Sequence, residues 1–337
     1  MAKRALITGI TGMVGSHLSD FLLDNTDWEI HGMVRWRSNF ENIAHLFPLI
    51  EKKDRVFLHY GDLNDFQSLL SVLEKSKPGY VFHLAAQSFP RTSFDIPADT
   101  LQTNIIGTEN LLSAIQVQKD LEPIIHVCSS SEIFGRVSEE KLPIDEECSF
   151  YPASPYAISK IGTDLLARFH AEAYKQKILT TRMFTHTGPR RGDVFVESTF
   201  AKQIAMIEAG LIEAVVKTGN LKSMRTWADV RDAVRAYYML LTVKPIPGEY
   251  YNIGGDFSCS VNDMLKTLLK MSTRDDIKVE IDPDRLRPID ADLQIPNTQK
   301  FKKHTGWKPE IPFEETMEDL LNYWREKIKI HGIQLRR

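Results

Sequence analysis

Short apolar runs alternate with longer amphipathic stretches through the first half of the chain. The runs rich in β-branched and other apolar residues predict strands at positions 5–8, 29–34, 56–60, 80–84 and 124–128. Apolar positions recur with helical spacing in the stretches 14–23, 66–75 and 100–116. Nearly continuous apolar strands are buried on both faces, and their alternation with helices favours a parallel sheet covered on both sides. We therefore expect an α/β fold built on a doubly wound parallel sheet.

The pattern changes after about residue 185. Helical stretches at 200–209, 230–241, 261–271 and 313–328 are separated by loops rich in glycine, proline and charged residues. This half predicts a smaller, mixed α/β lobe built over the carboxyl edge of the sheet. We expect a first domain over residues 1–184 and a second lobe mainly over 185–337, some segments of which return to the first domain.

Composition and charge narrow the range of partners. The chain has 337 residues, enough for one large or two moderate domains, and its 42% hydrophobic and 26% charged residues are ordinary for a globular protein. A formal net charge of -3 gives no reason to expect a nucleic acid or a membrane surface as partner. Apolar runs stay well below the ~18–20 residues of a membrane span, and the short run after the basic start is broken by Gly9 and Gly12. Three cysteines without a CxxC pair favour a reducing compartment, so we expect a cytoplasmic protein.

The first predicted strand runs directly into a glycine-rich turn. The sequence from Gly9 to Gly15 has the spacing GxxGxxG and opens the first predicted helix. Such a turn lets backbone N–H groups and the helix N-terminus face a pyrophosphate without an intervening side chain, although a tight strand–helix turn without a ligand has a similar composition. Its position favours a Rossmann-type dinucleotide site. The residues expected to contact the cofactor are Gly9, Thr11, Gly12, Met13, Val14 and Gly15.

The ends of the next strands indicate which dinucleotide binds. An NAD site usually has an acidic residue after the second strand, whereas this chain has Arg35 and Arg37, whose guanidinium groups suit a 2′-phosphate. They favour NADP over NAD, unless both are merely solvated. Asp62, after the third strand, either accepts a hydrogen bond from adenine or caps the next helix. The remaining residues expected along the cofactor are Leu63, Leu84, Ala85, Ala86 and Ser88.

A tyrosine and a lysine, Tyr156 and Lys160, are separated by one helical turn. In that arrangement the ammonium group stabilises the phenolate and lowers the tyrosine pKa from about 10. The tyrosine can then remove a proton from a sugar hydroxyl while a hydride leaves for a nicotinamide. A surface pair on an ordinary helix has the same spacing, but the preceding dinucleotide motifs favour the catalytic interpretation.

Polar residues follow the fifth predicted strand, at the edge where parallel sheets bind their ligands. Ser130, Ser131 and Glu132 are expected to border the cleft, with the carboxylate placed to move a proton. A serine-rich turn with a solvated glutamate is the alternative.

Three histidines at strand positions are interpreted as core or supporting residues: His83, His126 and His186. The spacing of histidines, cysteines and acidic residues predicts no metal site.

Together these motifs resemble the extended short-chain dehydrogenase/reductase superfamily, and within it the nucleotide-sugar enzymes. The resemblance covers nearly the whole chain and is strongest to the GDP-mannose 4,6-dehydratases and the GDP-4-keto-6-deoxymannose reductases. The glycine turn and the Tyr156/Lys160 pair carry part of it. The other stretches that carry it are 84–88, 104–108 and 129–132 in the first half, and 219–225, 286–288 and 306–309 in the second.

The resemblance implies a redox-neutral elimination on a nucleotide-diphosphate sugar, with GDP-mannose the closest match. Tyr156, assisted by Lys160, would deprotonate the sugar 4-hydroxyl as NADP accepts hydride from C4, with Ser130 hydrogen-bonded near the C4 oxygen. Glu132 would remove the C5 proton and protonate the departing C6 hydroxyl, after which the hydride returns to C6. A homodimer or homotetramer is also implied. The residues implied to bind the substrate are Ser88, Ser130, Ser131, Glu132, Thr185, Arg191, Lys202, Arg225, Arg287 and Asp290.

Some positions depart from the dehydratase pattern. Thr185 stands where the dehydratases carry an asparagine that contacts the substrate, whereas Arg191 matches their arginine. Asn104 and the stretch 200–204 are more similar to the reductases. The alternatives are therefore an NADPH-dependent GDP-4-keto-6-deoxy-sugar reductase and a nucleotide-sugar 4-epimerase. Glu132 favours elimination over epimerisation, because epimerisation needs no base at C5.

Overall fold

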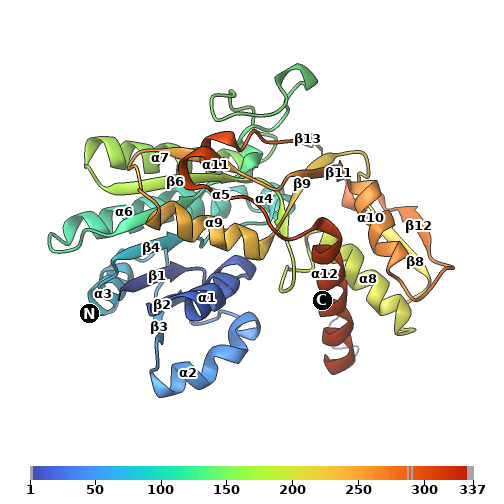
Figure 1. The fold of residues 1–337 in the computed structure, drawn as a ribbon, viewed down its shortest axis with the longest axis horizontal. Coiled ribbons are helices and arrows are strands. Elements are labelled where there is room, and N and C mark those ends of the chain that lie inside the picture. The colour runs from blue at the N-terminus through green and yellow to red at the C-terminus, as the bar shows by residue number, and fades with distance from the viewer. Residues whose placement is uncertain (1–2, 287, 290, 332–337) are drawn as a thin grey trace.

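The computed structural model describes residues 3–286, 288–289 and 291–331 and contains a central sheet of seven parallel strands (Figure 1). The strands lie in the order β10-β6-β5-β4-β1-β2-β3. Their bounds are β1 (Arg4–Thr8), β2 (Glu29–Val34), β3 (Val56–Tyr60), β4 (Tyr80–His83), β5 (Ile124–Cys128), β6 (Lys177–Met183) and β10 (Tyr250–Ile253). The inner strands are buried along almost their whole length because helices cover both faces of the sheet.

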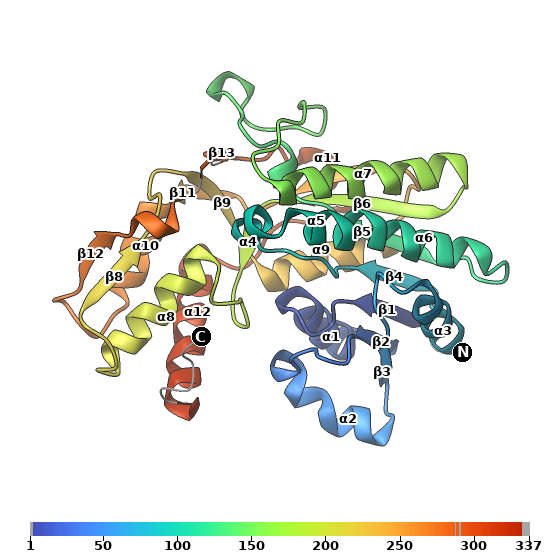
Figure 2. The ribbon, with the colours of Figure 1, turned by 180° about the vertical axis from the view of Figure 1, so that it is seen from behind.

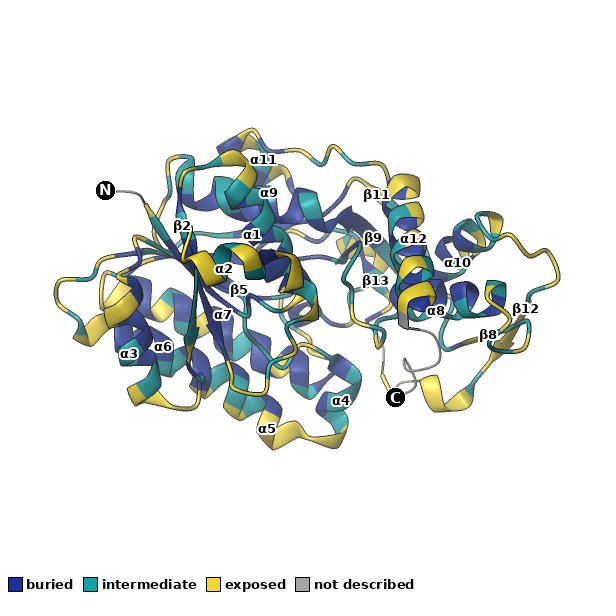
Figure 3. Cartoon of the chain, turned by 90° about the horizontal axis from the view of Figure 1, so that it is seen from below, coloured by how far each residue is buried: buried dark blue, intermediate teal, exposed yellow. Residues whose placement is uncertain are grey.

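Two helical layers cover this sheet (Figures 1 and 2). One layer contains α1 (Met13–Asn25), α9 (Val230–Thr242) and α11 (Gln299–Thr305), with the short segments η1 (Glu41–Leu46) and α2 (Phe47–Lys52). The other layer contains α3 (Phe66–Ser76), α6 (Gly107–Val117) and α7 (Pro155–Ala173). The helix faces that meet the sheet are buried and their outer faces are exposed, as Figure 3 shows. This arrangement confirms the predicted doubly wound α/β fold.

A second lobe with its own apolar core lies beyond the carboxyl ends of the strands. Its helices are α8 (Val196–Glu208), α10 (Val261–Lys270) and α12 (Phe313–His331). A four-stranded sheet contains β7 (His186–Thr187), β9 (Met224–Asp229), β11 (Phe257–Ser260) and β13 (Leu293–Gln294), and β8 (Val215–Thr218) pairs with β12 (Lys278–Ile281). Phe200, Met264 and Trp324 are among the buried residues that hold the three helices together.

The predicted elements of the first half agree with β1 to β5 within one residue at each end. One predicted helix differs, because the stretch 100–116 is divided into α5 (Pro97–Leu101), a π-helical segment (Gln102–Ile106) and α6. Beyond residue 185, the segments β10, α9 and α11 pack with the first domain rather than with the second lobe. The strand that borders β6 therefore comes from the second half of the chain.

The order of the strands in the sheet indicates where a ligand would bind. Strand β1 lies between β2 and β4, so the connections after β1 and β4 diverge at the centre of the sheet. In sheets of this type ligands bind outside the carboxyl ends of the strands at such a switch point. The loops after β1, β4 and β5, with α4 (Pro90–Asp95) and η3 (Ser131–Ile133), surround this crevice. None of the helices in the described part of the chain combines the length and apolar character needed to cross a membrane.

Candidate active site

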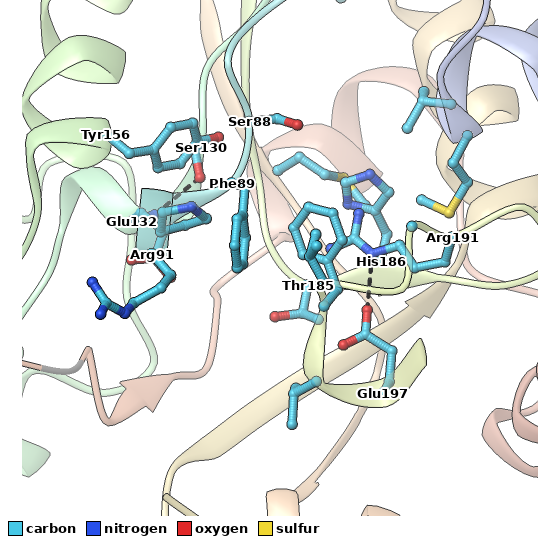
Figure 4. Close-up of a pocket in the computed structure, with 18 of the residues that line it drawn as sticks. Ser88, Phe89, Arg91, Ser130, Glu132, Tyr156, Thr185, His186, Arg191 and Glu197 are labelled. Atoms are coloured by element: carbon cyan, nitrogen blue, oxygen red, sulfur yellow. Dashed lines mark hydrogen bonds and ion pairs between the residues drawn. The ribbon is translucent and has the colours of Figure 1, made fainter. Parts of the chain in front are cut away.

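A cavity of about 620 Å³ lies between the carboxyl ends of the strands and the second lobe. Figure 4 shows Ser130, Glu132 and Tyr156 on one side of it and Thr185 and Arg191 on the other. Most of the residues predicted from the sequence line this cavity. They are Gly9, Gly12, Met13, Val14, Gly15, Leu84, Ala86, Ser88, Ser130, Ser131, Glu132, Tyr156, Lys160, Thr185, Arg191 and Arg225.

Other predicted residues lie elsewhere in the described chain or beyond it. Arg35 and Arg37 are exposed after β2, where the Arg37 guanidinium lies 4.3 Å from the centre of the Trp36 ring. Lys202 forms an ion pair of 2.8 Å with Asp193. The described residues outside the cavity lining also include Thr11, Asp62, Leu63 and Ala85. Two predicted residues fall outside the described residues: Arg287 and Asp290.

The helix after β3 is capped by Asp65 rather than by Asp62, which corrects one of the two roles predicted for Asp62. The carboxylate of Asp65 accepts hydrogen bonds from the N–H groups of Gln67 and Ser68 at the start of α3. Asp62 instead accepts one from the N–H of Asn64 at 2.9 Å, inside the preceding turn. Its other predicted role, a contact with adenine, stays a prediction.

The glycine turn after β1 has the backbone geometry that a dinucleotide site requires. Gly9 has a φ of +78°, and a Cβ atom there would lie 2.9 Å from the Ala85 nitrogen. A Cβ atom on residue 15 would lie 2.3 Å from the Gly9 oxygen, so α1 packs this closely because Gly15 has no side chain. Gly12 is the N-cap of α1, and the residues of the first turn are uncharged. The N–H groups at this positive helix end therefore suit a pyrophosphate.

A buried chain of hydrogen bonds connects the glycine turn to α7. Thr8, at the end of β1, lies 2.9 Å from Nδ1 of His83, and Nε2 of His83 lies 2.9 Å from the Thr108 hydroxyl. Thr108 donates to the carbonyl oxygen of Asn104, whose amide nitrogen donates to the Ser159 hydroxyl at 2.8 Å. Because Thr108 gives its proton to Asn104, Nε2 of His83 carries a proton and Nδ1 accepts one. His83 thereby connects the end of β1, through Thr108 and Asn104, to Ser159 on the long helix α7 (Pro155–Ala173).

The start of α7 follows from its local sequence. Ser154 is the N-cap and accepts a hydrogen bond from the N–H of Ala157 at 3.0 Å, while Pro155 occupies the first turn, where proline is favoured. Tyr156 and Lys160 follow on one face of the helix, and both side chains are buried. The pair predicted from its spacing therefore points inward, toward the cavity, and is not a surface pair.

The surroundings of this pair shift both pKa values. Burial raises the pKa of Tyr156, and the nearby Cys128 and Glu132 add to the rise, while a hydrogen bond with Ser130 opposes it. The net pKa of Tyr156 is therefore raised and not lowered as the spacing predicts, because desolvation of the phenolate dominates. The Lys160 ammonium donates to the carbonyl oxygen of Cys128 at 2.7 Å, and burial lowers its pKa.

Glu132 lies in η3, directly after β5, and faces a cation from the second lobe. Ser130 caps this short helix by accepting a hydrogen bond from the N–H of Glu132 at 3.2 Å. The Glu132 carboxylate lies 3.8 Å from the Arg225 guanidinium on β9, and their side chains are 16% and 13% exposed. The carboxylate is therefore held at the junction of the two lobes, within the same cavity as Tyr156.

Arg191 is fixed by two contacts inside the second lobe. Its Nε donates to the carboxylate of Glu197 at 3.0 Å, and its guanidinium carbon lies 3.4 Å from the centre of the Phe195 ring. Glu197 is only 2% exposed, so this pair sets the orientation of the arginine. A guanidinium group has five N–H donors, and the bond to Glu197 uses one of them. Arg191 can therefore still donate to an anionic ligand in the cavity.

His186, interpreted from the sequence as a core or supporting residue, lines the cavity. Its Nδ1 lies 3.1 Å from the carbonyl oxygen of Phe184, so Nδ1 carries the proton and Nε2 is an acceptor. Burial and the neighbouring charge of Arg191 lower the pKa of His186 to about 4, which keeps the ring neutral near pH 7. The sequence signal that could have placed His186 in the cavity is its position shortly after the carboxyl end of β6, the edge of the sheet where ligands bind.

Two further cavity residues belong to no motif. Asn42 lies in η1, and its amide nitrogen donates to the carbonyl oxygen of Thr11 in the glycine turn at 3.0 Å. Phe89, before α4, meets Phe195 edge to face with ring centres 5.7 Å apart, and Figure 4 shows Phe89 between the two sides of the cavity. Among the described residues, no group of three or more histidine, cysteine, aspartate or glutamate side chains is arranged to hold a metal ion.

The parallel sheet, the open glycine turn and the inward-facing Tyr156/Lys160 pair define a dinucleotide-dependent enzyme of the extended short-chain dehydrogenase/reductase class. A family model described as GDP-mannose 4,6 dehydratase matches residues 6–320. The chain therefore belongs to the GDP-mannose 4,6-dehydratase family, as the resemblance in its sequence motifs predicts.

Individual relatives agree with this assignment. The GDP-mannose 4,6 dehydratase of Drosophila melanogaster is 33% identical over 344 residues, which cover 95% of this chain and 85% of the relative. The GDP-mannose 4,6-dehydratase of Yersinia enterocolitica is 32% identical over 361 residues, covering 98% of this chain and 96% of the relative. Among solved structures, RMD from Pseudomonas aeruginosa complexed with NADPH is 27% identical with a TM-score of 0.81, and the match covers 96% of this chain and 100% of that chain.

Proposed function

We propose that this protein is an NADP-dependent nucleotide-sugar 4,6-dehydratase that converts GDP-mannose to GDP-4-keto-6-deoxymannose. The observation that carries the proposal is the convergence of Ser130, Glu132 and Tyr156 on one cavity beside the glycine turn. Reduction or epimerisation at C4 needs an acid–base group at the C4 oxygen. Elimination across C5 and C6 needs a second such group, and Glu132 supplies it. Membership of the GDP-mannose 4,6-dehydratase family supports the same reaction.

The residues around the glycine turn fit NADP. The N–H groups at the start of α1 would hold the pyrophosphate, and the guanidinium groups of Arg35 and Arg37 would pair with the 2′-phosphate. Both arginines are exposed directly after β2, where the adenosine ribose of such cofactors lies. RMD, which shares the fold, was solved with NADPH. The chemistry that NADP supplies is reversible storage of a hydride between C4 and C6 of the sugar, so that the cofactor is regenerated in every cycle.

The side chains of the first domain move the protons. Tyr156 takes the proton of the sugar 4-hydroxyl as C4 is oxidised, which requires that the positive charges of Lys160 and of the bound nicotinamide stabilise the phenolate against the burial that raises its pKa. Ser130, hydrogen-bonded to Tyr156, orients the same oxygen. Once C4 is a ketone, the C5 proton is acidic and Glu132 removes it. The protonated Glu132 then donates to the C6 hydroxyl, which leaves as water. C5 finally takes up the proton that Tyr156 received from the 4-hydroxyl, so that both side chains return to their starting states. Arg225, 3.8 Å from Glu132, holds the carboxylate toward the sugar.

The second lobe provides the groups that would bind the nucleotide diphosphate. Arg191 and Arg225 both line the cavity, and bidentate pairing of guanidinium with phosphate suits a diphosphate. Thr185 lies in the cavity wall opposite Tyr156 and is placed to contact the sugar. The other residues proposed to bind substrate are Ser88 and Ser131, which line the cavity. Contacts of Lys202, which pairs with Asp193 outside the cavity lining, and of Arg287 and Asp290 stay predictions.

We further propose that the protein is a homodimer that pairs through the outer faces of α6 and α7. Ile158, Leu165 and Phe169 on α7 are 49%, 48% and 52% exposed, and Val117 at the end of α6 is 58% exposed. An apolar stripe of this kind on a helical surface favours association with a second surface like it. A homotetramer is the alternative assembly.

All three cysteines are free, which supports the proposed location in the reducing cytoplasm.

The test is incubation of the purified protein with GDP-mannose and no added cofactor, followed by mass spectrometry of the nucleotide sugar. Loss of one water from the sugar nucleotide is the expected result. Glu132→Gln should reduce the rate by about 10²–10⁴-fold, the usual contribution of a general acid–base group. Glu139→Gln, which changes an exposed glutamate in η4 (Glu139–Lys141), serves as the matched control. Dehydration at the wild-type rate by Glu132→Gln would contradict the mechanism.

A further inference from the structure

An ion pair joins the last helix of the second lobe to a segment beside the glycine turn. Lys327 on α12 lies 2.8 Å from the carboxylate of Glu41 at the start of η1, with side chains 14% and 42% exposed. The two residues are far apart in the sequence and belong to different lobes. Their contact therefore ties the position of η1 to the second lobe.

The segment η1 lies along the expected path of the cofactor. It follows Arg35 and Arg37, which would bind the 2′-phosphate, and its Asn42 donates to the carbonyl oxygen of Thr11 in the glycine turn at 3.0 Å. Asn42 also lines the cavity together with the residues of that turn. A dinucleotide that reaches from the end of β2 to the glycine turn would therefore pass beneath η1.

A second set of side-chain contacts ties η1 to the same boundary between the lobes. His45, at the other end of η1, lies 2.6 Å from the carboxylate of Asp20 on α1. The same carboxylate lies 2.6 Å from the guanidinium of Arg190, which belongs to the loop between β7 and α8. Both ends of η1 are thus fastened through side-chain contacts that include a residue from beyond position 185.

Lys327 is held in place by its surroundings. Its ammonium lies 5.0 Å from the centre of the Trp324 ring, and the Trp324 indole N–H donates to the Ser198 hydroxyl of α8 at 2.8 Å. Burial opposes the charge on Lys327, but the contacts with Glu41 and with the Tyr323 hydroxyl, 3.3 Å away, together outweigh it and raise the pKa of the lysine. The cation is therefore anchored to the second lobe before it meets Glu41.

We propose that Glu41 and Lys327 are positioning residues that hold η1 closed over the diphosphate of bound NADP, so that the cofactor stays on the enzyme between cycles. This inference rests on the proposed function, in which NADP is regenerated in every cycle. An enzyme that must exchange its cofactor after each turnover gains nothing from slow release. An enzyme that recycles it in place loses turnover whenever the cofactor escapes.

The experiment measures the rate at which NADPH leaves the enzyme. The protein is loaded with NADPH and mixed with excess NADP+ in a stopped-flow fluorimeter, and the fluorescence of the bound nicotinamide is followed. Lys327→Met keeps the aliphatic packing on Trp324 but removes the charge, and Glu41→Gln removes the partner from the other lobe. Each should speed release about three- to fivefold, the range expected for one ion pair of this kind. Lys329→Met, which changes an exposed lysine on the same helix, is the matched control and should release at the wild-type rate.

Two further measurements separate the ion pair from a general loosening of the fold. The exchange of both residues, Glu41→Lys with Lys327→Glu, should bring release back to within about twofold of the wild type. In 1 M salt, where the Debye length is about 3 Å, the ratio between Lys327→Met and wild type should shrink toward one. Release by Lys327→Met and Glu41→Gln at the wild-type rate would overturn the inference and leave the proposed reaction intact. If the wild type does not bind NADPH, the proposed function fails together with the inference.

Discussion

Two buried histidines beneath the active site make the stability of the protein depend on pH. His83 and His126 are 3% and 0% exposed on the neighbouring strands β4 and β5, and burial lowers the pKa of each to about 3. In an unfolded chain the pKa of histidine is about 6.5. Because the folded value lies below the unfolded value, the unfolded chain binds more protons between these two values. Folding stability is therefore lost as the pH falls from about 6.5 towards 3.

The size of the loss follows from the difference between the two pKa values. Between pH 7 and pH 5, each such histidine lowers the free energy of unfolding by about 2 kcal/mol. His126 is the better site for a test, because its Nε2 lies 2.8 Å from the Thr181 hydroxyl while its Nδ1 has no hydrogen-bond partner among the described residues. His126→Gln keeps an amide for Thr181 and cannot titrate. We expect this variant to lose about 2 kcal/mol less stability than the wild type over the same pH interval.

The assay is urea-induced unfolding, followed by circular dichroism at pH 7 and pH 5 for both proteins. Only the difference between the two pH dependences is used, because the titrating groups that do not interact with His126 contribute equally to both proteins. The slope of free energy against urea should be the same for wild type and variant at each pH. Equal losses of stability in wild type and His126→Gln would refute the reasoning, since they would mean that His126 is not forced to stay neutral in the folded state.

Further predictions concern the catalytic pair, the cofactor and the assembly. Tyr156→Phe should lower the rate of GDP-mannose dehydration by about 10²–10⁴-fold and leave NADPH binding by fluorescence titration unchanged; turnover near the wild-type rate would exclude the tyrosine as the acid–base group. Arg35→Ala combined with Arg37→Ala should weaken NADP binding at least about tenfold and NAD binding little, measured by calorimetry, and an equal loss for both cofactors would contradict a 2′-phosphate site. Leu165→Glu should shift the protein to monomers in sedimentation velocity, whereas an unchanged mass would argue against pairing through α7.

The sheet could be predicted because its signals are local. The strands β1 to β5 are short apolar runs bounded by turn residues, and α3 and α9 begin after aspartates that cap them. The division of the stretch 100–116 could not be predicted in the same way. There the side chain of Asn104 bonds to the backbone of Gln87 and to Ser159, and both partners are distant in the sequence.

The residues of the site that belong to sequence motifs could be predicted. The glycine turn, Tyr156 and Glu132 follow elements whose ends are readable from the sequence, and all of them line one cavity. The place of Asn42 and Phe89 in the cavity could not be predicted, because the paths of their segments depend on contacts with residues distant in the sequence. The pKa of Tyr156 was predicted in the wrong direction because spacing shows which charge is near but not how much water the fold removes.

Strand β10 comes from the second half of the chain but completes the sheet of the first half, and this has a consequence for the synthesis of the protein. Strand β6 ends at Met183, but its outer neighbour ends at Ile253. At about 5–20 residues per second, the ribosome needs several seconds to make the intervening chain. During this interval the nascent polypeptide presents a strand that is almost wholly buried in the folded protein and has one unpaired edge, which is a template for pairing with other chains. The Rossmann half should therefore depend on chaperones while it is being made, and the same half expressed alone should aggregate.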